Sequence, residues 1–371
     1  MSSLKFKKNI LFVTPLYRPA VGGAATYFST LSDYLKNKAQ VFVLTTYYKG
    51  EKFIEKKDTI RLFRIIPNVL VGNRFLRYIT LPIISFLATL VLSLIYRPKC
   101  IHCHSGTGIA LGPLFFSYIS KIPLFLDVQD LFTPAWILKI GRIKKYVAFG
   151  PAVEKRLLEL GIKKSKIRMF IPINPPIVDI ISKIKKQKSK RFRIISIGEL
   201  SKIKGVDILL KAFKLIYDVL GDNVSLIILG DGPEKKYCEN YIKQNSLQSN
   251  IKLLGRKDYK TTLIKLRNSD LVIIASRSES WCRIIIEAFR LKVPVIATNV
   301  GGIPFLIKNN INGFLVTPED PNGIASAAIN LYHHKELRNK FINNGINFVD
   351  KMQNWKQLSD KIYEMYNIDE K

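Results

Sequence analysis

Two glutamates separated by seven residues, Glu279 and Glu287, are the side chains whose type and spacing point most clearly to chemistry. The apolar run 271–275 before them has the length of a buried strand, and the Ile-rich segment around Glu287 is long enough for a packed helix. We therefore expect Glu279 in a strand-to-helix loop and Glu287 inside the helix. Open α/β sheets bind ligands at the carboxyl ends of their strands, beside helix N-termini that attract anions. The segment predicts a site for a ligand with sugar hydroxyls and phosphates.

Three other glycine-containing loops are expected between a strand and a helix. Gly22-Gly23 would let the backbone approach a phosphate closely, and a plain tight turn is the alternative. This loop has neither the G-x-G-x-x-G spacing of dinucleotide-binding proteins nor the ending of a P-loop. The loop that begins at Gly198 carries Lys204 near a helix start, where a cation is unfavourable against the helix dipole, which suggests that an anion binds there. Gly230 and Gly232 form the third loop, a weak signal by itself.

Strand-like and helix-like segments alternate along the chain, which predicts an α/β fold. The strands of the second half are separated by enough residues for right-handed crossovers, which predicts a parallel sheet. We expect two Rossmann-like, doubly wound parallel-sheet domains that face a cleft. The predicted strands are 10–13, 41–45, 60–65, 100–103, 124–128, 146–149, 167–171, 192–197, 225–229, 251–254, 271–275, 295–298 and 314–316, and helices of the first half are 24–36, 79–96, 109–119 and 152–160.

The domain boundaries follow from changes in composition. Residues 1–175 form the predicted N-terminal domain, and a linker is expected at 176–190 because a proline-rich segment and a lysine-rich stretch meet there. Residues 191–350 form the predicted C-terminal domain. The tail, 351–371, has helical spacing and is expected to pack back on the N-terminal domain.

The chain is strongly basic, with 59 Lys and Arg against 28 Asp and Glu and a net charge of +31 over 371 residues. Such an excess favours nucleic acid, anionic membrane or phosphorylated ligands. No zinc-finger spacing or single-strand aromatic pattern supports nucleic acid. The densest basic stretch, Lys183 to Arg193, is a solvated linker or a contact for lipid phosphates. Because residues 1–8 lead directly into a strand, we expect no signal peptide and a cytosolic protein.

The segment Ile79 to Tyr96 carries no charge and reaches the lower length limit for a membrane span. Positive residues flank the segment on both sides, Arg74 and Arg77 before it and Arg97 after it. Their distribution therefore predicts no orientation of this segment across a membrane. A span would also place the strands before and after it on opposite sides of a bilayer. We therefore expect a buried or interfacial helix.

The segment Cys100 to His104 has the spacing C-x-x-C-H, which is also found in haem attachment and offers zinc ligands. Covalent haem attachment belongs to exported proteins, and the sequence offers no second pair of zinc ligands. On a strand, His102 and His104 share one face and Cys103 lies on the other. We therefore expect the two histidines to face the cleft at a strand end, with no metal bound.

Taken together, these segments resemble the retaining glycosyltransferases of the GT-B fold, family 4 (glycosyl transferases group 1), over nearly the whole chain. The second half gives the more specific match. The resemblance rests on Gly22-Gly23, 101–104, Gly198, Lys204-Gly205, 230–233, Leu254-Gly255, Glu279, Glu287-Ala288, 293–298, Gly301-Gly302 and Asn312-Gly313.

The resemblance implies a nucleotide-sugar donor held by the second domain and an acceptor held by the first. Glu287 would accept hydrogen bonds from ribose hydroxyls, and Lys204 would neutralise the departing diphosphate. Glu279 would position the transferred sugar, which makes Glu279 and Lys204 the predicted catalytic residues. Further donor contacts are expected from Gly22, Gly23, Gly198, Gly230, Gly232, Arg256, Ser280, Trp281, Cys282, Arg283 and Ile284.

On the acceptor side, the resemblance implies His102, His104, Gln129 and Asp130. Many relatives have His where this chain has Gln129, which can donate or accept a hydrogen bond but cannot titrate. Many also have Arg where this chain has Glu199, so Lys202 or Arg283 would have to replace it.

The sequence predicts no cofactor. It has no D-x-D pair for a metal, and the nucleotide sugar is a co-substrate. We expect a hexosyltransferase that acts on a lipid-linked or glycan acceptor, peripheral on the inner face of the cell membrane and in contact with anionic lipid. A basic nucleic-acid-binding protein, a GT-B epimerase and an inverting transferase are the alternatives.

Overall fold

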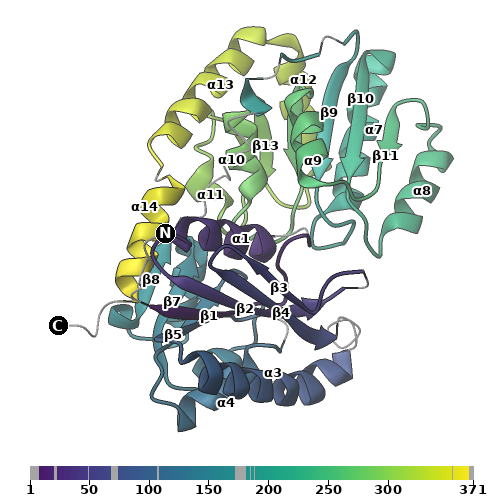
Figure 1. Cartoon of the computed structure of the whole chain (residues 1–371). Coiled ribbons are helices and arrows are strands. Elements are labelled where there is room, and N and C mark those ends of the chain that lie inside the picture. Colours follow the sequence, from purple (N-terminus) through teal and green to yellow (C-terminus); the bar gives the residue numbers. More distant parts are fainter. Residues whose placement is uncertain are drawn as a thin grey trace. The chain divides into compact units, whose positions relative to one another are not determined.

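The computed structural model describes residues 8–20, 23–48, 50–67, 74–106, 108–171, 181–183, 185–187, 189–352 and 354–366. The chain divides into two compact units (Figure 1). Unit 1 comprises Met1–Pro172 with Gln353–Lys371, and unit 2 comprises Ile173–Met352. Each unit has its own sheet with helices on both faces, so the predicted α/β class with two doubly wound sheets is confirmed.

Unit 1 contains an eight-stranded sheet in the order β3-β4-β2-β1-β5-β6-β7-β8. All neighbouring strands run parallel except β3, which pairs antiparallel with β4 at the edge. The strands are β1 (Asn9–Val13), β2 (Gln40–Tyr47), β3 (Ile54–Lys57), β4 (Ile60–Pro67), β5 (Cys100–His104), β6 (Leu124–Val128), β7 (Ile143–Phe149) and β8 (Ile167–Phe170), and the helices are α1 (Gly23–Leu35), α3 (Arg74–Tyr96), α4 (Leu111–Ile119), α5 (Pro151–Glu159) and α14 (Trp355–Met365), with 3-10 turns at Ile137–Lys139 and Lys164–Lys166.

Helices cover both faces of this sheet because its strands are apolar on both sides. Leu11 and Ile101 share one core with Leu81 of α3 and Leu114 of α4. On the opposite face, the ring of Phe12 lies 5.3 Å from that of Phe28 in α1. The sheet therefore separates the pair α3 and α4 from α1 (Figure 1).

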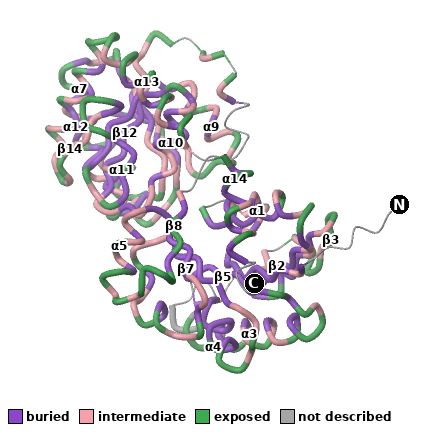
Figure 2. Tube along the Cα trace, turned by 90° about the vertical axis from the view of Figure 1, so that its left-hand side faces the viewer, coloured by how far each residue is buried: buried purple, intermediate pink, exposed green. Residues whose placement is uncertain are grey.

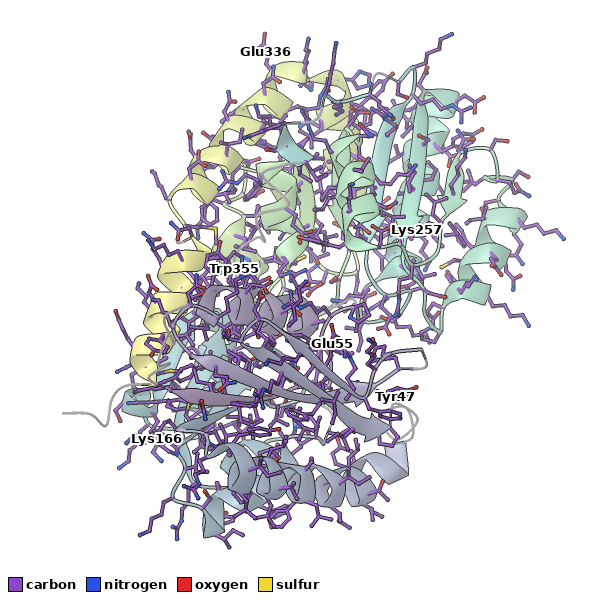
Figure 3. All side chains as sticks on the ribbon, viewed as in Figure 1. Tyr47, Glu55, Lys166, Lys257, Glu336 and Trp355 are labelled. Atoms are coloured by element: carbon purple, nitrogen blue, oxygen red, sulfur yellow. The ribbon has the colours of Figure 1, made fainter. Side chains whose placement is uncertain are left out.

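The last helix, α14, packs on α1 of unit 1. Asn354 and Gln357 form a capping box at its start. Next to the cap, the indole of Trp355 (Figure 3) stacks 6.3 Å from the ring of Tyr34. Tyr366, directly after the helix, reaches the imidazole of His102 with its hydroxyl at 2.5 Å. The chain thus returns to unit 1 after completing unit 2.

Unit 2 contains a six-stranded, fully parallel sheet in the order β11-β10-β9-β12-β13-β14. Strand β12 is buried along its whole length (Figure 2), and so is β13. The strands are β9 (Phe192–Ile197), β10 (Val224–Leu229), β11 (Ile251–Leu253), β12 (Leu271–Ile274), β13 (Val295–Thr298) and β14 (Phe314–Val316), and the helices are α7 (Val206–Leu220), α8 (Lys235–Gln244), α9 (Tyr259–Arg267), α10 (Arg283–Arg290), α11 (Ile303–Leu306), α12 (Pro321–His333) and α13 (Lys335–Asp350), with a 3-10 turn at Gly221–Asn223.

Part of the segment expected as a linker packs on unit 2. Ile181 is 1% exposed within its core. Lys186 donates to the carbonyl of Ser269 at 2.6 Å and pairs with Asp270 at 2.7 Å. Arg193 also lies against Asp270. These two cations of the basic stretch are therefore held by unit 2, while 172–180 lie outside the described residues.

Two local differences from the sequence prediction have simple causes. Strand β3 was not predicted because its sequence, Ile-Glu-Lys-Lys, has no apolar alternation. Charged lysines suit an edge strand, since they discourage pairing with another chain. Helix α3 begins at Arg74, earlier than the predicted start at Ile79, and continues through Pro82.

Candidate functional site

The candidate site lies in unit 2, where the loops after neighbouring strands are hydrogen-bonded to one another. The loop after β9 bonds to both neighbouring loops: its Leu200 amide donates to the carbonyl of Asp231 at 3.1 Å, and its Ile203 carbonyl accepts from the amide of Arg277 at 2.8 Å. The Gly302 amide donates to the carbonyl of Glu279 at 2.9 Å. Because β10, β9, β12 and β13 are adjacent and parallel, their carboxyl ends form one edge. The predicted donor loops therefore meet.

Glycine is required where these loops approach each other most closely. Gly205 has φ +64°, and a Cβ there would collide with the carbonyl oxygen of Ala275. Gly301 has φ +51°, and its Cβ would collide with the carbonyl oxygen of Glu279. Both positions combine a left-handed backbone with contact to another loop, so a larger residue is excluded twice. The loops that carry Lys204 and Glu279 are thus fixed by backbone packing.

Lys204 and Glu279 form an ion pair. The ammonium Nζ lies 2.7 Å from Oε1 of Glu279, which also accepts a hydrogen bond from Ser276 at 3.1 Å. Glu279 is 9% exposed, so the pair is largely desolvated. Burial lowers the pKa of Lys204, but the charge and hydrogen bond of Glu279 outweigh this effect and raise it. Lys204 therefore stays cationic and is held at a defined position.

Glu287 is fully buried in α10. Its Oε1 accepts a hydrogen bond from the hydroxyl of Tyr259 at 3.0 Å and lies 3.6 Å from Nη2 of Arg283. Its Oε2 is buried and has no hydrogen-bond partner among the described residues. Burial raises the pKa of Glu287, while Arg283 and then the Tyr259 hydrogen bond oppose the rise. A ligand hydroxyl could therefore donate the hydrogen bond that Oε2 lacks.

Arg277 links three segments around this edge of unit 2. Its guanidinium makes two 2.8 Å bonds to the carboxylate of Asp207, at the start of α7. It also pairs with Glu319 and donates to the carbonyl of Lys202. A planar guanidinium that engages both oxygens of a carboxylate gives strong geometric control. Arg277 therefore holds the 202–205 loop against the end of β12.

Sequence reasoning did not identify Tyr259, Ser276, Arg277 or Asp207. Tyr259 is 28 positions from Glu287, and only the packing of α9 against α10 brings the two side chains together. Ser276 and Arg277 stand in the same segment as Glu279, so their proximity to the acid was a usable signal. The pairing of Arg277 with Asp207 links residues 70 positions apart and has no local signature.

The other predicted donor residues lie as follows. Arg256 is exposed after β11, and Cys282 is buried directly before α10. The indole Nε1 of Trp281 is buried without a hydrogen-bond partner in the described part of the chain. Gly198, Gly230 and Gly232 lie in the interlocked loops, Ser280, Arg283 and Ile284 are half-buried in or before α10, Gly23 begins α1 in unit 1, and Gly22 lies outside the described residues.

The two proposed replacements for the missing arginine differ. Arg283 lies beside Glu287, and its guanidinium carbon is 5.9 Å from the centre of the Tyr259 ring. Lys202 has an exposed side chain on the same loop as Lys204. Glu199 is also exposed. Arg283 therefore already interacts with Glu287, whereas the Lys202 side chain forms no ion pair among the described residues.

The two histidines predicted on the acceptor side, in unit 1, are buried. His102 is fully buried on the α1 side of the sheet, and its Nδ1 contacts the hydroxyl of Tyr366. Burial lowers the pKa of His102 to about 3. His104 is 8% exposed and accepts a hydrogen bond from the amide of Gly106 at 2.8 Å, and burial lowers its pKa to about 4. Both imidazoles are therefore neutral at pH 7, and His102 does not reach the surface of the unit.

Gln129 and Asp130 are half-buried just after β6. The amide of Gln129 donates to Oδ2 of Asp127 at 2.7 Å. Asp127 is fully buried, and burial raises its pKa well above the usual value. Asp130 accepts from the amides of Phe132 and Thr133 and so fixes its own loop. Only His104, Gln129 and Asp130 therefore lie at the end of their strands where a ligand could reach them.

Comparisons with known proteins show what the chain is similar to. Residues 178–348 match the family Glycosyl transferases group 1. N-acetyl-alpha-D-glucosaminyl L-malate synthase of Bacillus anthracis is 33% identical over 145 residues, which cover 39% of this chain and 37% of that protein. The alignments with the first curated relatives span less than half the length of those proteins.

Several solved structures resemble nearly the whole chain. Sucrose-phosphate synthase from Thermosynechococcus elongatus superposes with a TM-score of 0.80 at 17% identity, covering 97% of this chain and 98% of that one. Anabaena HepE, solved with UDP and glucose, gives a TM-score of 0.74 at 18% identity, covering 97% and 100%. At such low identities the likeness shows the fold, and the predicted GT-B fold is confirmed.

Proposed function

We propose, from the premise that this chain belongs through residues 178–348 to the glycosyl transferases group 1, that it moves a sugar from a nucleotide-diphosphate donor to an acceptor. The observation that carries the proposal is Glu287, a fully buried carboxylate with one oxygen satisfied by Tyr259 and the other unpartnered among the described residues. Ribose hydroxyls of a bound donor would supply the missing hydrogen bond. The UDP-bound structure of HepE, a protein of the same fold, supports a nucleotide ligand.

Lys204 is proposed to stabilise the leaving diphosphate. In the absence of ligand its charge is balanced by Glu279 at 2.7 Å. A donor phosphate would compete with Glu279 for the ammonium, and the released carboxylate could then accept a hydrogen bond from the transferred sugar. The amides at the start of α10 would add positive potential at the phosphate. Since these groups supply the positive charge, the proposed transfer needs no metal ion and no other cofactor.

Retention of the anomeric configuration is part of the proposal. In a front-face reaction the acceptor hydroxyl attacks from the side of the leaving group, and a phosphate oxygen takes its proton. The C1–O bond to the diphosphate breaks as the new C1–O bond forms, so no enzymic nucleophile is needed. The engagement of Glu279 with Lys204 and Ser276 supports a positioning role over a nucleophilic one.

The acceptor is proposed to be lipid-linked or a glycan, and the protein to be cytosolic and peripheral on the inner membrane face. The net charge of +31 supports contact with anionic lipid. Among the described residues, one helical segment, Tyr78–Tyr96, is long and apolar enough to cross a membrane by length and composition, and 39% of its apolar 18-residue window is buried in the protein. Within unit 1, His104, Gln129 and Asp130 are the proposed acceptor contacts.

The donor is best identified by thermal shift against UDP-, GDP-, ADP- and dTDP-sugars, because a ligand that binds only the folded state raises the melting temperature. We expect one nucleotide class to stabilise the protein. The product of transfer with that donor should keep the anomeric configuration in its NMR spectrum, and an inverted product would refute retention. Stabilisation by random DNA and by none of the nucleotide sugars would favour a nucleic-acid-binding protein instead.

A further inference from the structure

The outer surface of the α3 and α4 pair in unit 1 is apolar. No charged residue occurs from Tyr78 to Tyr96, a segment with a mean hydropathy of 2.2. Side chains project from both helices away from the sheet (Figure 3). The exposed large apolar residues are Tyr78, Ile79, Ile83, Leu87, Val91, Leu94 and Ile95 on α3, and Phe115, Tyr118 and Ile119 on α4, with exposures from 38% to 69%.

These residues form one continuous surface. Ile79, Ile83, Leu87 and Val91 recur every four positions and therefore line one ridge of α3. The two helices pack so closely that a Cβ on Gly112 of α4 would collide with Ser85 and Phe86 of α3. We call the exposed apolar residues of α3 and α4 named above the α3–α4 face.

A transmembrane role for α3 conflicts with the sheet. β4 precedes α3 and β5 follows it, and β2 and β1 join these two strands within one sheet. A bilayer between the ends of α3 would have to separate strands that are hydrogen-bonded through their neighbours. The helix therefore lies along the unit, with Leu81 and Leu92 in the core and Leu87 and Leu94 outside. A helix on a water-exposed surface would carry polar residues on that side.

The charged residues around the α3–α4 face are basic, which favours an anionic partner. The sequence has no Asp or Glu between Asp58 and Asp127. Within that interval, Arg97 and Lys99 follow α3 and Lys121 follows α4, all with exposed side chains. Trp136 lies 6.2 Å from the ring of Tyr78 at one end of the face, close in sequence to the exposed Lys139. Apolar residues bordered by cations and aromatic rings are typical of a surface that enters a lipid headgroup region.

We propose that the α3–α4 face inserts into the headgroup and outer acyl region of an anionic membrane, with Arg97, Lys99 and Lys121 contacting lipid phosphates. Burial of the apolar ridge supplies most of the affinity, and the cations add a part that salt can screen. The basic stretch 183–193 contributes less, because Lys186 and Arg193 interact with Asp270. The proposal extends the peripheral location proposed above by naming the contact surface.

The test is co-sedimentation of the full chain with phosphatidylcholine vesicles with and without phosphatidylglycerol. Leu87→Glu combined with Leu94→Glu places two charges on the ridge. We expect this variant to lower the partition coefficient on anionic vesicles by about a hundredfold, since each lost leucine contact corresponds to about a tenfold change or more. Val219→Glu on α7 of unit 2 is the matched control, because Val219 is 63% exposed. Binding of this control should equal that of the wild type.

A tryptophan variant tests the same face in case the double glutamate variant does not fold. Leu87→Trp should shift its fluorescence to the blue with anionic vesicles and be quenched by brominated lipid, and Val219→Trp should not. Part of the wild-type binding should persist in 1 M NaCl. Unchanged binding of the double variant in a folded state would overturn the proposal. So would a lipid-free dimer that the double variant dissociates, because the face would then join two copies of this chain.

The result of the vesicle-binding test is independent of the test of the proposed function. Donor stabilisation should be equal in the wild type and the double variant, since the substitutions lie in unit 1 and the donor residues other than the Gly22-Gly23 loop lie in unit 2. Vesicle binding without stabilisation by any nucleotide sugar would refute the donor assignment and leave the membrane face supported.

Discussion

The two units have similar parallel sheets but use the polar residues at their strand ends differently. In unit 2, Lys204 and Glu279 form an ion pair, and Glu287 has one carboxylate oxygen without a partner among the described residues. In unit 1, His102 and Asp127 are fully buried, and burial shifts their pKa values toward the neutral forms. The same fold thus carries a charged site in one unit and mainly neutral polar packing in the other.

The two units also differ in how apolar the exposed surfaces of their helices are. Of the twenty-two large apolar side chains that are exposed among the described residues, seventeen lie in unit 1. In unit 2, α13 begins with Lys335 and Glu336 and continues with Arg338, and the Glu336 side chain points away from the ribbon (Figure 3). Unit 2 therefore has an ordinary water-exposed surface, whereas unit 1 has an apolar one. The comparison fits the two proposals above, in which unit 2 binds the donor and unit 1 contacts the membrane.

The largest expected effect is that of Lys204→Met. Removing the cation that would face the leaving diphosphate should lower kcat by about 100- to 1,000-fold, the usual cost of losing one transition-state donor. The melting temperature should also fall, because the largely buried carboxylate of Glu279 loses its cation, so kcat is compared where both proteins are folded. Lys211→Met, at an exposed lysine of α7, is the control and should stay within a few-fold of the wild type. Near-normal turnover of Lys204→Met would remove the catalytic role from unit 2.

For unit 1 we expect the reverse pattern from His102→Gln, a loss of stability with little specific effect on kcat. The contact with Tyr366 is buried, so its disturbance should cost about 1–3 kcal/mol in the free energy of unfolding. Because the pKa of about 3 in the folded state lies below the usual histidine value of 6.5, the unfolded state binds the proton first. Stability of the wild type therefore falls as pH decreases below about 6.5. Chemical denaturation at pH 7 and pH 5 should show a smaller acid loss in the variant.

A larger loss of kcat than of stability in His102→Gln would contradict this division between the units. Asp127 acts in the opposite direction, since its raised pKa favours the folded state in acid, and His104 acts in the same direction as His102. The variant should therefore reduce the acid sensitivity without abolishing it.

Much of this fold was predictable because its strands are short apolar runs with clear ends. β6, β9, β13 and β14 have the predicted bounds. The donor loops were also predictable, since strand order in a parallel sheet brings their ends together. Contacts between side chains that are far apart in the sequence could not be predicted. The pairing of Arg277 with Asp207 is the clearest case. The burial of His102 depends on Tyr366, a residue 264 positions later in the sequence.

Arg277→Lys tests whether that missed contact positions the Lys204 loop. Lysine keeps the charge but cannot reproduce the two bonds to Asp207, so kcat/KM should fall about tenfold, equal to about 1.4 kcal/mol. The loss should appear mainly in kcat if the loop is misplaced. Arg290→Lys is a matched control, because Arg290 pairs with Asp350 outside the site. Equal effects of both substitutions would show that Arg277 contributes only general stability.

The smallest expected effect is a shift in the pH dependence of donor binding. Ionised Glu287 is the better acceptor, so affinity should fall as pH decreases through its raised pKa. Arg283 and Tyr259 both lower that pKa, with Arg283 the larger cause. Arg283→Met and Tyr259→Phe should therefore move the acid limb to higher pH, the first further than the second. Calorimetric titrations from pH 5 to pH 8 would measure both, and a shift to lower pH would contradict the geometry.

The most direct test of the donor site is a calorimetric titration of wild type and Glu287→Gln with the nucleotide sugar that stabilises the protein. The substitution keeps the shape of the side chain but weakens its acceptor, so we predict about 10- to 100-fold weaker binding at pH 7. The unliganded melting temperature should not fall by more than a few degrees. Equal donor affinity in the two proteins would contradict the assignment of Glu287, and with it the central claim that unit 2 binds a nucleotide sugar through its buried carboxylate.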